Sequence, residues 1–110
     1  MTALIVDRSA ARLLELSDAM HRLYPDAHVF VETDPQMAGK FSRQTHVDLL
    51  LAADCGEALV RAAHMGNPAV RIVAVTENGR EGGAELPPGT DGCVDWPAPD
   101  AALGQALARP

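Results

Sequence analysis

The chain has 110 residues, of which 47% are hydrophobic and 22% charged, and its formal net charge at neutral pH is −6. This composition excludes an intrinsically disordered chain, and the length suits one domain with its own core over residues 1–110. The negative charge argues against direct nucleic-acid binding, because contacts with phosphates need a basic face.

The two cysteines, Cys55 and Cys93, lie in different segments and lack the close spacing of a zinc or redox motif. We expect both to be reduced thiols in a cytoplasmic protein. No apolar run reaches the roughly 20 residues that span a bilayer, and the N-terminal residues lack the basic start of a signal peptide. The sequence therefore predicts a cytoplasmic domain without membrane contact.

Short apolar runs alternate with helical patterns along the chain. The run at residues 3–6 is continuous, as expected of a strand that is buried on both faces of a sheet. Strands are predicted over residues 3–6, 27–32, 47–53, 70–75 and 93–96. This alternation predicts βαβ units and a parallel sheet with helices on both sides.

The helices between these strands have recognisable ends. Ser9 is a suitable N-cap for the first helix, which Pro25 ends. Asp34 precedes a proline at the first position of the second helix, whose apolar side is expected to consist of Met37 and Phe41. The third and the last helix are predicted over residues 56–65 and 99–108.

The segment 77–92 breaks the alternation. It lies where a helix should join the fourth and fifth strands, but it contains five glycines and two prolines. In a helix interior each glycine costs about 1 kcal/mol and each proline about 3 kcal/mol. We expect a loop with at most one turn around residues 83–86, so that the fourth helix is lost or vestigial.

The ends of the strands resemble a known family. The first strand ends at Asp7, the fourth at Thr76 and the fifth at Trp96-Pro97. In this arrangement the chain resembles the receiver domain of bacterial two-component response regulators, the CheY-like domains. The resemblance implies a doubly wound five-stranded parallel sheet of order 2-1-3-4-5, with the chemistry at the carboxyl ends of the strands.

The resemblance also implies where a phosphorylation pocket would lie. In the family an acidic pair after the first strand binds Mg²⁺, whereas this sequence has Asp7 followed by Arg8. The third strand of the family ends in the aspartate that accepts the phosphoryl group. Matching the earlier acid to Asp48 puts Ala53 at that position and Asp54 one residue later. Since side chains alternate along a strand, a slip of one residue turns the side chain to the other face.

The rest of the pocket has one match and two departures. Thr76 matches the threonine or serine that contacts the phosphoryl group in the family. The Lys-Pro of the family is Trp96-Pro97 here, which we expect to be a cis peptide bond. The aromatic residue of the fifth strand, which the family links to switching, is Cys93. The pocket implied by the resemblance is therefore degenerate.

These departures remove the parts that phosphoryl transfer needs, namely metal ligands and cations in the correct positions. Mg²⁺ prefers carboxylate and other oxygen ligands, and a cation beside it is repelled. The sequence therefore predicts no stable Mg²⁺ site, no other cofactor and no physiological phosphorylation.

The roles of single residues stay open at two places. Arg8 either replaces the metal by pairing with Asp7 or Asp54, or points to solvent. Thr76 either lines the pocket or is an ordinary polar residue at a strand end. We expect Asp54 to be the N-cap of the third helix, and Trp96 to pack over the former acidic pocket.

The sequence predicts an atypical receiver domain that acts in signal transduction or transcriptional regulation through protein–protein contact. Its partner would be an output domain, a kinase or regulator, or a second copy, for which the last helix and last strands are the family's habitual surface. An enzyme is not expected, because the sequence offers no nucleophile–base pair. Two alternatives stay open: a divergent phosphoacceptor that uses Asp54 with Mg²⁺, and a small-molecule binder at the carboxyl-end crevice.

Overall fold

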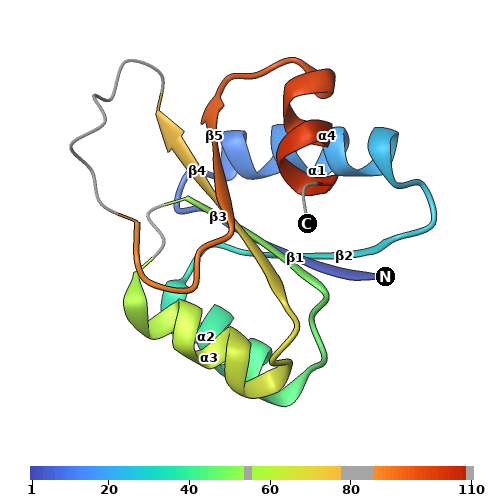
Figure 1. Ribbon diagram of the computed structural model, residues 1–110. Helices are drawn as coiled ribbons and strands as arrows, with labels where there is room; N and C mark the ends of the chain where they lie inside the picture. The colour runs from blue at the N-terminus through green and yellow to red at the C-terminus, as the bar shows by residue number, and fades with distance from the viewer. Residues whose placement is uncertain (54–55, 78–85, 109–110) are drawn as a thin grey trace.

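The computed structural model of the protein describes residues 1–53, 56–77 and 86–108. Five strands form one parallel sheet in the order β2-β1-β3-β4-β5 (Figure 1). The strands are β1 Thr2–Val6, β2 His28–Glu32, β3 Leu49–Ala53, β4 Arg71–Glu77 and β5 Gly92–Trp96. The predicted fold class and strand order are confirmed.

Helices cover both faces of the sheet. They are α1 Ala10–Leu23, α2 Pro35–Gln44, α3 Glu57–Gly66 and α4 Asp100–Ala108. In Figure 1, α1 and α4 lie above the sheet and α2 and α3 below it. Two apolar clusters fill the spaces, one beneath α1 and α4 and the other beneath α2 and α3. The continuous apolar runs of β1 and β3 contribute side chains to both clusters, because their residues alternate between the faces.

The first two helices begin as the sequence predicts. The Ser9 side chain accepts a hydrogen bond from the backbone N–H of Arg12, and the Asp34 side chain accepts one from Gln36. These bonds satisfy backbone donors that the first turn of a helix leaves free. The prediction for α3 was wrong, since its N-cap is Gly56, which makes no side-chain cap bond. Asp54 itself lies outside the described residues.

The buried side of α2 differs from the expectation. Met37 is half exposed, and the residues that α2 buries fully are Ala38, Gly39 and Ser42. Phe41 is partly buried against the apolar cluster beneath α2 and α3. Because α2 packs directly on α3, small residues occupy the contact, and the larger Met37 is directed away from it.

Half of the segment expected to lack its helix, residues 78–85, lies outside the described residues, which resume at Leu86. From there to β5 the backbone forms a turn, in which Thr90 N–H donates to Pro87 O over 3.2 Å. Gly89 has a positive φ of 94°, a conformation that favours glycine. Within the described part of the chain, no helix is long and apolar enough to cross a membrane.

Candidate functional site at the carboxyl ends of the strands

The parallel register brings the predicted site residues to one end of the sheet. Val6 pairs with Ala52, so Asp7 follows β1 at the level of Ala53, the last residue of β3. On the other side Thr76 pairs with Asp95, and Trp96 ends β5. The peptide bond between Trp96 and Pro97 is cis, as predicted.

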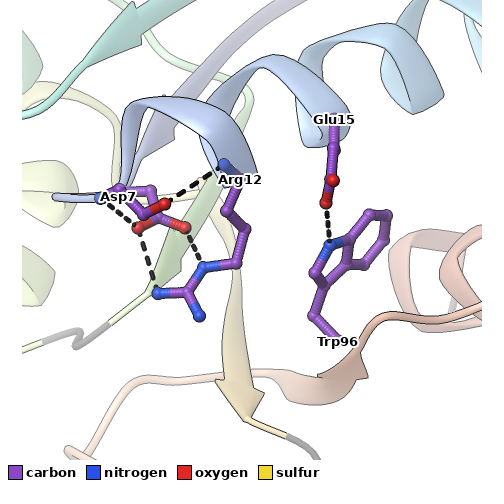
Figure 2. Close-up of polar contacts among 5 residues, drawn as sticks. Asp7, Arg12, Glu15 and Trp96 are labelled. Atoms are coloured by element: carbon purple, nitrogen blue, oxygen red, sulfur yellow. Dashed lines mark hydrogen bonds and ion pairs between the residues drawn. The ribbon is translucent and has the colours of Figure 1, made fainter.

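Asp7 is the fully buried acid of this site. Its Oδ1 accepts hydrogen bonds from the backbone N–H of Ser9 at 2.8 Å and from Nη2 of Arg12 at 3.1 Å. Nε of Arg12 donates to Oδ2, so the guanidinium binds both carboxylate oxygens (Figure 2). Such a bidentate pair supplies the positive charge and the donors that a buried carboxylate requires.

The pairing that we considered for Arg8 belongs to Arg12. The structure leaves Arg8 exposed after β1, in agreement with the alternative in which it points to solvent. Asp7 precedes the N-cap Ser9, and the first turn of α1 directs the Arg12 side chain back over the end of β1. The sequence carries no distinct signal for this pairing, because Arg12 is not among the apolar residues that define the buried side of α1.

This arrangement does not fit the Mg²⁺ that the family would place beside Asp7. A cation already occupies both oxygens of the carboxylate, and a divalent ion at the same place would meet the guanidinium charge. Across the described residues, no three His, Cys, Asp or Glu side chains are grouped so that they could hold a metal ion.

The position that the resemblance assigns to the phosphoacceptor carries a methyl group. Ala53 is buried and belongs to the apolar cluster beneath α1 and α4. Its side chain offers neither a nucleophile nor a metal ligand. Asp54, the neighbouring candidate, lies outside the described residues.

Thr76 is engaged with the neighbouring strand. Its hydroxyl donates to the carboxylate of Asp95, and the Val94 carbonyl oxygen lies 3.3 Å from the same hydroxyl. Asp95 was not singled out in the sequence, because a carboxylate near the end of a short strand has no distinctive pattern. The register of β4 and β5 is what places it opposite Thr76.

Trp96 joins the end of β5 to α1. Its indole Nε1 donates to Oε1 of Glu15 at 3.0 Å (Figure 2). The ring packs against the apolar cluster beneath α1 and α4. Glu15 follows Arg12 by three residues, so the two side chains are neighbours along the helix. One side of α1 therefore holds both the acid after β1 and the aromatic residue that ends β5.

A groove of about 670 Å³ lies elsewhere, between the beginning of β5 and α4. Gly92, Cys93 and Ala106 are among the residues that line it, and Cys93 is an exposed free thiol. This groove is at the amino end of β5, whereas the small-molecule alternative assumed a crevice at the carboxyl ends.

No protein-family model matches the sequence, and no curated protein matches it. The fold is nevertheless similar to several solved structures. The receiver domain of the sensor histidine kinase PA1611 from Pseudomonas aeruginosa is 19% identical, with a TM-score of 0.80 over 96% of this chain and 93% of that chain. That structure holds a magnesium ion in its active site cleft.

Two further receiver proteins give similar values. A response regulator receiver protein from Sinorhizobium medicae is 18% identical, with a TM-score of 0.77 over 98% of this chain and 91% of that chain. The chemotaxis protein CheY4 of Vibrio cholerae is 17% identical, with a TM-score of 0.74 over 96% and 94% of the two chains. At these identities the similarity establishes the fold, which is that of response-regulator receiver domains.

Proposed function

We propose that this chain is an atypical receiver domain that acts in signal transduction by binding another protein, without being phosphorylated. The observation that supports the proposal most strongly is the bidentate pair of Arg12 with the buried Asp7. In a receiver that is phosphorylated, the corresponding acid helps to hold Mg²⁺. Here a permanent cation neutralises it, so that its charge is compensated without a metal or a phosphoryl group.

A second contact supports the same proposal. The hydroxyl of Thr76 is bound to Asp95, although in the family this position responds to the phosphoryl group. The acid at the metal-binding position and the hydroxyl at the phosphoryl-contacting position thus both have partners from the chain itself. Such a domain has one resting conformation, and its signal is the presence or absence of its protein partner.

The domain acts as a binding module in the cytoplasm, with no catalytic step of its own. Its partner is an output domain, a kinase or regulator, or a second copy. Direct contact with nucleic acid is not part of the proposed role, because the net charge of the chain is −6.

Mass spectrometry of the purified chain after incubation with acetyl phosphate and Mg²⁺ tests the proposal. We expect no phosphoryl adduct, and no change of Trp96 fluorescence on addition of Mg²⁺ alone. A receiver known to accept phosphate from acetyl phosphate is the positive control. An adduct that is lost in Asp54→Asn would overturn the proposal and establish the phosphoacceptor alternative.

A further inference from the structure

Strand β2 is an open edge of the sheet and carries exposed apolar side chains. In residues 1–53, 56–77 and 86–108, β2 pairs with β1 on one side and with no strand on the other. Phe30 is 45% exposed and Val31 is 49% exposed. Strands β1 and β3, in the interior of the sheet, are buried almost throughout, whereas β2 exposes apolar side chains to solvent. Exposed apolar edge strands tend to pair with another chain.

Every second residue of β2 has backbone N–H and C=O groups that do not face β1 and could pair with another strand. His28 N–H donates to Met1 O at 2.9 Å, and Glu32 O accepts from Asp7 N–H at 3.2 Å. Residues 28 and 32 therefore direct these groups towards β1. Because the directions alternate along a strand, the N–H and C=O groups of Val29 and Val31 point to the open edge.

We propose that β2 pairs with β2 of a second copy of this chain, antiparallel, about a two-fold axis at Phe30. In this register Val29 of one copy lies opposite Val31 of the other, and the two residues exchange both of their N–H···O bonds. Phe30 lies opposite its own equivalent in a pair without hydrogen bonds, where the side chains approach most closely. The two sheets then form one continuous sheet.

The side chains at the two ends of β2 select this register. His28 of one copy lies opposite Glu32 of the other, and the two-fold axis repeats the pair. An imidazole N–H opposite a carboxylate is a favourable cross-strand pair. A register centred on Val29 would instead place Asp26 opposite Glu32, so that two carboxylates would repel each other. A register centred on Val31 would place Glu32 opposite Phe30.

The ring of Phe30 is already held in position for this contact. It packs on Phe41 of α2, with ring centroids 5.0 Å apart. A fixed ring loses little side-chain entropy when a second copy binds. The self-complementary strand thus identifies the partner as another copy of this chain. This surface lies at the opposite edge of the sheet from β5, where the family's habitual surface is expected.

Charge substitutions at His28 test the antiparallel pairing of the two β2 strands. His28→Lys places a cation opposite Glu32, whereas His28→Glu places a second carboxylate there. We expect sedimentation equilibrium to show a wild-type dimer, with its dissociation constant lowered roughly tenfold by Lys and raised roughly tenfold by Glu. His21→Lys and His21→Glu, at an exposed position of α1, are the matched controls for net charge. A monomer at all concentrations, or equal effects at both positions, would contradict the proposal.

A disulfide test reports the geometry directly. With Cys55 and Cys93 changed to serine, Phe30→Cys places two thiols across the axis, where Cα atoms about 4.5 Å apart allow a disulfide. Val31→Cys is the matched control, because Val31 is equally exposed but lies opposite Val29. We expect rapid oxidation to a covalent dimer for Phe30→Cys alone. Equal rates for the two variants would exclude this register. Neither test depends on phosphorylation, so each result is separable from that of the proposed function.

Discussion

The indole Nε1 of Trp96 lies 3.0 Å from a carboxylate oxygen of Glu15, and this hydrogen bond connects the end of β5 to α1. One turn earlier on the same helix, Arg12 binds the carboxylate of Asp7 after β1. Two residues one helical turn apart on α1 therefore contact the ends of β1 and β5, which are not neighbours in the sheet. This double attachment restricts movement of α1 relative to the candidate site.

Substitution of Trp96 tests the first attachment. Trp96→Phe keeps an aromatic ring but removes the N–H donor, so the free energy of unfolding should fall by about 1 kcal/mol. Urea denaturation followed by circular dichroism measures the change. Glu15→Gln retains a carbonyl acceptor and should have a smaller effect. Full stability of Trp96→Phe would show that the hydrogen bond contributes nothing.

Substitution of Arg12 tests the second attachment. Arg12→Ala leaves the carboxylate of Asp7 buried without its cation, and we expect a loss of about 3 kcal/mol in the free energy of unfolding. Arg8→Ala is the matched control, because Arg8 is exposed and its loss should change stability by less than about 0.5 kcal/mol.

A double-mutant cycle identifies the cause of that loss. If Arg12 acts through Asp7, the variant Asp7→Ala/Arg12→Ala should be more stable than the sum of the two single effects predicts. Equal stability losses in Arg12→Ala and Arg8→Ala, or strict additivity in the cycle, would contradict the role that we assign to the pair.

The caps of α1 and α2 could be predicted from the local sequence. The strand order and the cis bond at Trp96-Pro97 could be predicted from the resemblance to receiver domains. The partner of Asp7 could not. Adjacency in the sequence favoured Arg8. The chain instead enters α1 after Asp7, and the Arg12 side chain in the first turn of this helix binds the Asp7 carboxylate. Contacts of this kind depend on tertiary geometry that hydrophobic periodicity does not encode.

The ion pair between α1 and α4 gives a prediction about pH. Arg22 donates to both oxygens of Asp100, at 2.8 and 3.0 Å, and this hydrogen bonding lowers the pKa of Asp100 from its ordinary value of 3.8. A carboxyl pKa that is lower in the folded state stabilises the fold above the unfolded pKa. This contribution is lost as the pH falls through the folded pKa.

Arg22→Gln should therefore raise the pKa of Asp100 towards 3.8, as measured by nuclear magnetic resonance titration of its carboxyl carbon. Arg43→Gln removes the same charge from α2, on the opposite face of the sheet, and should leave the titration of Asp100 unchanged. An unchanged Asp100 titration in Arg22→Gln would show that the pair does not persist in solution.

Two helical glycines at the contact of α2 and α3 should respond oppositely to alanine. A Cβ at Gly66 would lie 1.8 Å from the carbonyl oxygen of Ser42, so Gly66→Ala must displace backbone and should destabilise the fold by about 2 kcal/mol. A Cβ at Gly39 would meet Ala62 at 3.8 Å, an ordinary contact. Gly39→Ala should therefore raise stability by up to about 1 kcal/mol through helix propensity. Thermal unfolding of both variants tests the packing, and a stable Gly66→Ala would mean that α3 ends farther from α2 than the structure places it.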